Sequence, residues 1–305
     1  MNQTFNYMKI YDCFQFFDEE MLLDLRLNIM DKYVDKFVIT EATYMHNGKP
    51  KKLNFDIKKY SKFKEKIIYI VVDDQPPNLY EIRDSDNDKQ DTRGQKLVLN
   101  GYKRDNYQRE KAAYSLKDLD PEDWIIINDI DEIPNLENVS FKNIKNKIII
   151  FRQKVFYYKF NLLYPGISWY GSKISKKKNF ISPQWLRDLK HKKYPLWRLD
   201  TLFSKKKYTN IIHINDGGWH FTNIKSPDDI KKKLSNYTHH YEFEQSGLNI
   251  DDLKKKITEK KIIYDHGVDQ RQPKWKSEKT LTKTDLKNMP TYLRENYKKY
   301  ANWLE

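Results

Sequence analysis

The chain has 305 residues and a formal net charge of +14, because 57 lysines and arginines outnumber 43 aspartates and glutamates. Hydrophobic residues make up 38% of the chain and aromatic residues 14%, which excludes a wholly disordered protein. The single cysteine, Cys13, excludes an intramolecular disulfide and a zinc site built from several thiolates. The positive charge is compatible with nucleic acid, anionic lipid or phosphorylated small molecules as partners.

No apolar run approaches the roughly 18 residues that a membrane-spanning helix needs. The segment Met1–Met8 is polar and leads directly into a strand-like segment, which argues against a signal peptide. The sequence therefore predicts a chain without a leader or a membrane-spanning helix, located in a reducing compartment, the cytoplasm.

The first half of the chain alternates short apolar runs with amphipathic segments. A helix is expected to begin at Asp18 as its N-cap, and a second helix is expected over residues 105–119. Runs rich in β-branched and aromatic residues predict four strands: 8–13, 37–40, 67–72 and 124–127.

Apolar strands that alternate with helices predict an α/β fold with a mainly parallel central sheet flanked by helices. Such sheets bind ligands beyond the carboxyl ends of their strands. Acidic residues follow three of the predicted strands at those ends: Glu41, Asp73, Asp74, Asp129 and Asp131. The sequence therefore predicts a binding site at this edge of the sheet.

The second half is less regular. Residues 147–158 predict a long strand or hairpin arm, and residues 211–214 predict a short strand that leads to Asp216-Gly-Gly-Trp-His220. Helices are expected over three further segments: 224–243, 253–263 and 290–304. No internal repeat and no persuasive domain boundary is found.

The segment from Trp124 to Pro134 carries the main chemical signal. If the strand stays extended through Asp131, its period of two places Asp129 and Asp131 on one side. Neighbouring carboxylates repel each other unless a cation lies between them, and their oxygens suit Mg²⁺ or Mn²⁺, which can neutralise a diphosphate. A solvated acidic turn is the alternative. The chain has neither a P-loop nor a dinucleotide-binding glycine motif.

Eight short motifs follow one another over nearly the whole chain: Tyr11–Asp18, Val38–Thr43, Gly48–Pro50, Leu53–Phe55, Tyr107–Arg109, Ile126–Pro134, Gly218–Phe221 and Tyr292–Tyr297. In this order they resemble glycosyltransferase family 17. The ordered set is far more specific than one Asp-x-Asp motif.

The resemblance implies a GT-A-like nucleotide-diphospho-sugar transferase fold in a single domain, residues 1–305. Its nucleotide-sugar-binding half would span about 1–135, and its acceptor-side half with the C-terminal helices about 136–305. It also implies an inverting enzyme that moves GlcNAc from UDP-GlcNAc to a hydroxyl of a glycan or glycoconjugate, with Mn²⁺ or Mg²⁺ as cofactor. Animal members are Golgi membrane proteins with several cysteines, so this chain with one cysteine fits a bacterial or viral glycan better.

The resemblance also implies roles for particular residues. Asp129 and Asp131 are expected to bind the metal and the donor diphosphate, and His220 to complete the metal shell. A buried core histidine is the alternative for His220. Either Glu132 or the nearby Asp216, which lies outside the matched motifs, is expected to act as the general base, and capping of a turn is the alternative for Glu132.

Four other residues are expected to contact the donor. Lys49 and Arg109 would bind phosphate oxygens, Glu41 would face the nucleotide, and Trp219 would stack on a sugar or base. Surface ion pairs are the alternative for Glu41 and Arg109.

Three lysine-rich segments are either solvated loops or contacts with anionic lipid at the inner membrane surface: 176–178, 190–193 and 205–207. No nucleic-acid partner is expected, because the basic residues are scattered and no RNA-binding motif occurs. Two rival functions stay open: a basic nucleic-acid-binding protein and a metal-dependent phosphodiesterase.

Overall fold

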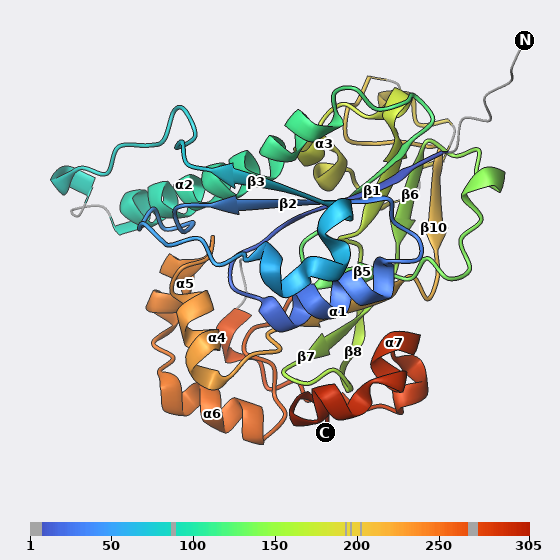
Figure 1. Ribbon diagram of the computed structural model, residues 1–305. Helices are drawn as coiled ribbons and strands as arrows, with labels where there is room; N and C mark the ends of the chain where they lie inside the picture. Colours follow the sequence, from blue (N-terminus) through green and yellow to red (C-terminus); the bar gives the residue numbers. More distant parts are fainter. Residues whose placement is uncertain (1–7, 87–89, 193, 196, 202, 268–273) are drawn as a thin grey trace, which may run out of the picture.

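The computed structural model describes residues 8–86, 90–192, 194–195, 197–201, 203–267 and 274–305. Two β-sheets form the centre of the molecule, and helices pack between them and on their outer faces (Figure 1). The α/β class that the sequence predicts is confirmed.

Sheet 1 has seven strands in the order β10-β6-β9-β4-β1-β2-β3. Its strands are β1 (Ile10–Gln15), β2 (Lys36–Ala42), β3 (Ile67–Val72), β4 (Trp124–Ile127), β6 (Ile148–Phe151), β9 (Lys173–Lys176) and β10 (Ile211–Ile214). Parallel pairs join β3, β2, β1 and β4, but β9 runs antiparallel to both β4 and β6.

Sheet 2 has five strands in the order β12-β8-β7-β11-β5. Its strands are β5 (Glu132–Pro134), β7 (Gln153–Tyr157), β8 (Leu162–Trp169), β11 (Gly218–Thr222) and β12 (Thr282–Lys283). Only β7 and β11 pair in parallel. Both sheets are therefore mixed, and the predicted mainly parallel sheet is not confirmed.

The chain passes between the sheets through short connections at residues 128–131, 152, 170–172 and 215–217. The predicted strand 147–158 is therefore two strands, β6 in sheet 1 and β7 in sheet 2, separated by Arg152 alone. The backbone N–H of Arg152 donates to the Ile214 carbonyl at 3.0 Å, so this connection lies beside the one at 215–217.

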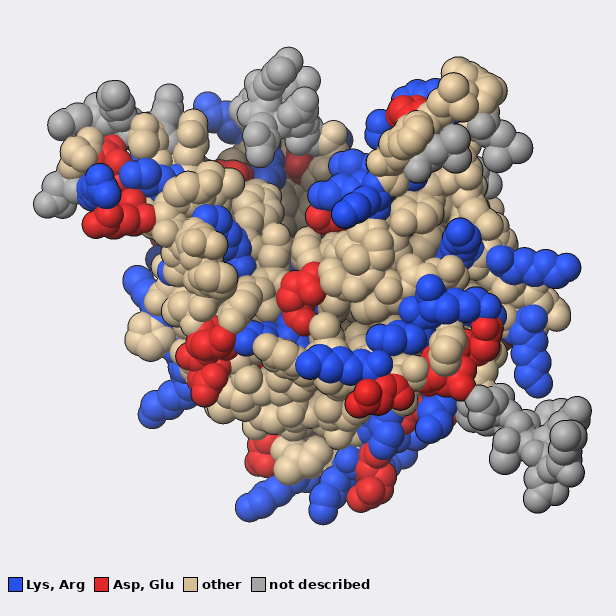
Figure 2. Space-filling model, turned by 90° about the horizontal axis from the view of Figure 1, so that it is seen from above, with Lys and Arg blue, Asp and Glu red and all other residues tan. Residues whose placement is uncertain are grey.

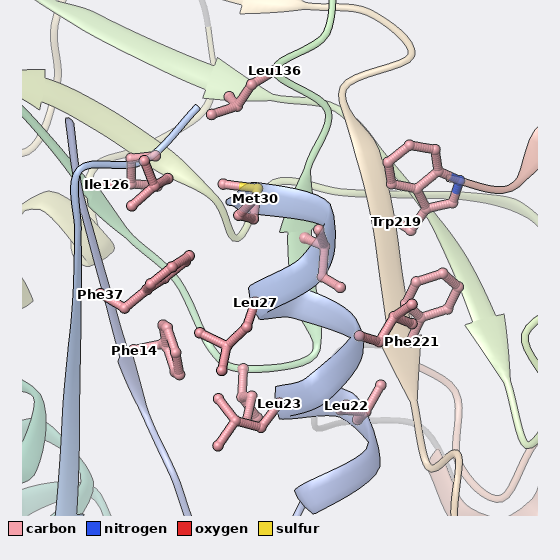
Figure 3. Packing of buried hydrophobic residues seen from close by; sticks show 14 of the residues in the cluster. Phe14, Leu22, Leu23, Leu27, Met30, Phe37, Ile126, Leu136, Trp219 and Phe221 are labelled. Carbon is pink, nitrogen blue, oxygen red and sulfur yellow. The ribbon is translucent and has the colours of Figure 1, made fainter. Parts of the chain in front are cut away.

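Helix α1 (Glu20–Met30) packs between the two sheets. In Figure 3 its leucines meet Phe14 and Phe37 of sheet 1 on one side and Phe221 of sheet 2 on the other. The predicted N-cap is wrong by one residue, because Glu19 precedes the helix and Asp18 forms an ion pair with Lys225.

Two other helices cover the outer face of sheet 1, and three cover sheet 2. The former are α2 (Gln90–Glu110) and α3 (Pro183–Asp188), and the latter are α4 (Pro227–Leu234), α5 (His240–Ser246) and α6 (Ile250–Thr258). Helix α7 (Thr291–Glu295) contacts α1. The 3-10 helices are Ile57–Lys66, Asp84–Asp86, Lys111–Leu116, Phe141–Asn143, Lys177–Asn179, Leu199–Thr201, Lys274–Lys276, Leu286–Asn288 and Tyr297–Trp303.

The predicted helices 224–243 and 290–304 are therefore each divided into shorter pieces. Across the described residues, every helix is too short or too polar to cross a membrane.

Candidate active site

A cavity of about 680 Å³ lies at the carboxyl ends of the parallel strands of sheet 1. Gln15 ends β1, His46 follows β2 and Asp129 follows β4, and all three line the cavity. Trp169 of β8 and His220 of β11 line it from sheet 2. This is the edge at which open α/β sheets bind ligands and at which the sequence predicts a site.

A buried arginine of α1 holds the turn that follows β4 in place. Arg26 is fully buried, pairs with Asp12 of β1 at 2.7 Å, and donates to the carbonyl of Glu132 at 2.7 Å. A second bond from Arg26 reaches the Ile130 carbonyl at 3.2 Å. These bonds close a turn over Ile130–Asp131, so the strand ends at Ile127 and does not extend through Asp131 as expected.

Asp129 lies between two arginines at the base of the cavity. Its Oδ1 accepts from Arg109 at 3.1 Å and its Oδ2 from Arg187 of α3 at 2.7 Å. Burial raises the pKa of the Asp129 carboxyl, although both arginines act in the opposite direction. Arg109 also pairs with Asp105 of α2, so positive and negative groups alternate along this wall.

Glu132 does not line the cavity, and both of its oxygens are buried and hydrogen-bonded. Its two oxygens accept from Arg187 at 2.6 and 2.8 Å, from the indole of Trp169, and from the backbone N–H of Asp129 at 2.9 Å. The side chain is fully buried. A Cβ on Gly171 would meet Glu132 Oε1 at 1.9 Å, so this close approach requires glycine. The predicted base role for Glu132 is therefore not supported.

Asp131 is bound less tightly. Its oxygens lie 3.7 Å from His220 Nε2 and 3.7 Å from Lys233 Nζ of α4, which is beyond hydrogen-bond distance. Burial alone would raise the pKa of Asp131, but His220 and Lys233 hold it well below its ordinary value. Asp131 therefore presents an ionised carboxylate to the cavity.

His220 belongs to an aromatic group on the wall that faces sheet 1. Its ring stacks on Trp169 with ring centroids 4.7 Å apart, and His266 lies 6.4 Å away. The Nδ1 of His220 and the Nε2 of His266 are buried without a hydrogen-bond partner among the described residues. Burial lowers the pKa of His266 to about 3, so this ring is neutral at physiological pH.

Three predicted donor-binding residues do not line the cavity. Glu41 is fully buried and accepts from Lys51 at 2.5 Å and from the backbone of Asn54 at 2.7 Å. Lys49 is exposed. Trp219 packs in the core around α1, and its indole donates to the Asn288 carbonyl at 2.8 Å.

Asp216, the other predicted base, is also outside the cavity. Its side chain is 83% exposed and lies 3.2 Å from Lys154 Nζ. The site therefore brings together Asp129, Asp131, Arg109 and His220, but not Asp216.

The predicted metal site fits these residues only in part. No three His, Cys, Asp or Glu side chains within the described ranges form a ready metal site, and Asp129 is held by arginines. Asp131 and His220 are adjacent and offer a carboxylate and an imidazole nitrogen. The carboxylate suits Mn²⁺ or Mg²⁺, and the imidazole favours a transition metal such as Mn²⁺.

Sequence reasoning missed Arg187, Trp169, Lys233 and His266, which line the same cavity. Arg187 belongs to α3, whose end is fixed by Lys173 of β9 through a 2.7 Å bond to the Leu189 carbonyl. None of these residues stands in a motif, and tertiary packing alone brings them together.

Known proteins were compared with the chain by sequence and by structure. The human and rat β-1,4-mannosyl-glycoprotein 4-β-N-acetylglucosaminyltransferases are each 29% identical to it over 128 residues, 39% of this chain. The match covers 21% of the human protein and 20% of the rat protein, so the chain spans about a fifth of the length of these relatives.

Among solved structures, that of HddC from Yersinia pseudotuberculosis complexed with GMP-PN covers 78% of this chain and 100% of its own. Its TM-score of 0.32 and identity of 11% are too low to indicate a shared fold or function.

The sequence model of Glycosyltransferase family 17 matches residues 2–304. Because this match spans almost the whole chain, the protein belongs to glycosyltransferase family 17.

Proposed function

We propose that the enzyme transfers GlcNAc from UDP-GlcNAc to a hydroxyl of a glycan or glycoconjugate with inversion, in a GT-A-like arrangement. The observation that carries this proposal is the position of Asp131 and His220 in a large cavity at the carboxyl ends of parallel strands. The names of the curated relatives support the sugar. The division into halves near residue 135 stays a prediction.

The donor diphosphate needs positive charge at this end of the cavity. Lys233 lies beside Asp131 and makes no hydrogen bond to it, so its ammonium group is available to a phosphate oxygen. Asp131 and His220 would hold Mn²⁺ or Mg²⁺, which would stabilise the negative charge on the leaving diphosphate. Arg109 and Arg187 are occupied by carboxylates, so they position Asp129 and do not contact phosphate directly.

Inversion requires a group that accepts the proton of the attacking hydroxyl. Because neither Glu132 nor Asp216 lines the cavity, we assign this role to Asp188 at the end of α3. It lines the cavity, its side chain is 35% exposed, and it accepts from Gln184 at 2.9 Å and Lys206 at 2.7 Å.

Ligand-dependent thermal stability tests the donor and the cofactor together. The full chain is heated with UDP-GlcNAc, UDP-GalNAc, UDP-glucose or GDP-mannose, with Mn²⁺ or with EDTA. We expect UDP-GlcNAc to raise the Tm most, and only when the metal is present. A larger shift with another donor would contradict the proposed sugar, and an equal shift in EDTA would contradict the cofactor.

Substitution of the cavity carboxylate tests the site. We expect Asp131→Asn to lower UDP-GlcNAc turnover by about a hundredfold or more and to leave the fold intact, because the change removes a charge near the leaving group. Asp216→Asn is the matched control and should retain wild-type turnover, since Asp216 is exposed and outside the cavity. Undiminished turnover of Asp131→Asn, measured by release of UDP, would refute the site.

The rival functions gain no support. On the face in Figure 2, lysines and arginines are interspersed with acidic residues and do not form one continuous basic patch. The similarities to known proteins favour neither a nucleic-acid-binding protein nor a phosphodiesterase.

A further inference from the structure

The segment that follows α3 exposes three large apolar side chains. Trp197 is 75% exposed, Leu199 69% and Phe203 90%, which are the highest values for large hydrophobic residues in the described part of the chain. They lie within seven residues of one another in the sequence. Single exposed apolar residues are ordinary on a protein surface, but a group of this kind marks an interaction site.

Hydrogen bonds hold the two ends of this segment close together. The backbone N–H of Lys190 donates to the Lys206 carbonyl at 2.9 Å, and the indole of Trp185 in α3 donates to the Lys205 carbonyl at 2.7 Å. Trp185 itself packs in the apolar cluster on the outer face of sheet 1. The exposed apolar residues are therefore carried by a loop whose base is fixed to the body of the enzyme.

The same loop is strongly basic. Residues 190–207 contain seven lysines and arginines and one acidic residue, Asp200. Asp200 pairs with Arg198 and Lys207. Lys206 pairs with Asp188, and no ion pair among the described residues involves Lys190, Lys192 or Lys205.

We propose that this loop docks the enzyme on an anionic lipid surface. Trp197, Leu199 and Phe203 enter the headgroup region, and the unpaired lysines lie over the lipid phosphates. Aromatic side chains such as Trp favour this interfacial depth. A second copy of the chain fits poorly, because the apolar residues of both copies would be surrounded by like charges that repel.

Docking through this loop orients the cavity. Gln184 and Arg187 of α3 line the cavity, and the loop begins directly after this helix. The lipid surface would therefore lie near the α3 wall. The inference depends on neither the donor nor the metal, so vesicle binding and sugar transfer succeed or fail separately.

Vesicle sedimentation tests the proposal with the full chain. Phosphatidylcholine vesicles are compared with vesicles that also contain phosphatidylglycerol, at low and high salt. Trp197→Ser with Phe203→Ser removes apolar contacts, and Lys192→Glu with Lys205→Glu reverses charge. Tyr114→Ser, at a residue 60% exposed elsewhere, and Lys254→Glu with Lys255→Glu on α6 are the matched controls.

We expect binding that requires phosphatidylglycerol, weakens with salt and falls about tenfold or more in each loop variant. Both controls should bind like the wild type, and all variants should keep the wild-type Tm and donor hydrolysis. Failure to bind phosphatidylglycerol vesicles would overturn the proposal. Equal binding by the loop variants would also overturn it, as would retention by an acidic polypeptide column without vesicle binding.

Discussion

Arg187 joins two carboxylates that belong to the same turn but have different surroundings. One guanidinium group donates to Asp129 at 2.7 Å and to both oxygens of Glu132 at 2.6 and 2.8 Å. Its side chain is 16% exposed and that of Glu132 is fully buried. A bidentate fork of this kind fixes the direction in which both acids point.

Removal of Arg187 should therefore be costly. We expect Arg187→Ala to lower the free energy of unfolding by about 3–5 kcal/mol, because a buried carboxylate loses its partner. The loss for Arg187→Lys should lie between those of the wild type and Arg187→Ala, since lysine keeps the positive charge but cannot form the bidentate contact. Arg198→Ala, which breaks an exposed pair with Asp200, is the control and should cost about 0–1 kcal/mol. Urea unfolding measures all three, and equal losses for Arg187→Ala and Arg198→Ala would contradict this account.

At the residue scale the sequence predicts the strand ends well and side-chain direction poorly. Asp129 and Asp131 line the cavity because they follow a buried strand, as expected. His220 and Trp219 are neighbours on β11, so they point to opposite faces, and only one of them can reach the cavity. Trp219 faces the core because α1 packs against that side of β11, and His220 therefore faces the cavity. The local sequence pattern does not predict which face α1 covers.

At the scale of elements, α1 is the structural centre of the fold. Leu23, Leu25 and Leu27 are fully buried, and Arg26 reaches the turn after β4 from the same helix. The helix therefore packs the two sheets together (Figure 3). Through Arg26 it also supports the turn that carries the cavity carboxylates.

A cavity made in this helix should destabilise the whole protein. We expect Leu27→Ala to lower the free energy of unfolding by about 2–5 kcal/mol through lost burial and an unfilled void. Leu53→Ala is the same change at a side chain that is 42% exposed, and it should cost less than about 1 kcal/mol. Denaturant titration measures the free energy of unfolding of both variants. Similar unfolding midpoints for the two would argue against α1 as the centre of the core.

Most strands of sheet 1 were predictable because β-branched runs such as Ile125–Ile127 strongly favour strands, but β9 was not, because its lysines suggest a basic loop. In sheet 2, β7 was predicted within residues 147–158, whereas β5, β8, β11 and β12 were not predicted as strands. The helix predicted over 224–243 was too long, since α4 ends at Leu234 and α5 begins only at His240.

At the scale of the whole molecule, stability depends on many carboxylates paired with lysines and arginines. Burial alone would raise the pKa values of Asp131, Glu242 and Asp265, but nearby cations lower all three. Each of these acids therefore binds a proton more readily in the unfolded chain than in the folded one. The stabilisation is complete above the ordinary carboxyl pKa and is lost as the pH falls below it.

We accordingly expect the free energy of unfolding to fall by about 2 kcal/mol or more between about pH 6 and about pH 3. The net charge of +14 adds repulsion as further carboxylates are protonated. Urea unfolding at several pH values measures the slope, and Asp265→Asn should make it shallower. A stability that rises on acidification would contradict the assignment.

The walls of the cavity come from residues as far apart as Gln15 and Lys274, through strands that alternate between the two sheets. During synthesis on the ribosome, β1 must therefore wait for a partner strand that emerges more than a hundred residues later, because β1 pairs with β4 through Ile10 and Trp124. A nascent chain that stops before β11 lacks His220 and one side of the site, so the cavity is complete only after strands of both sheets have been synthesised.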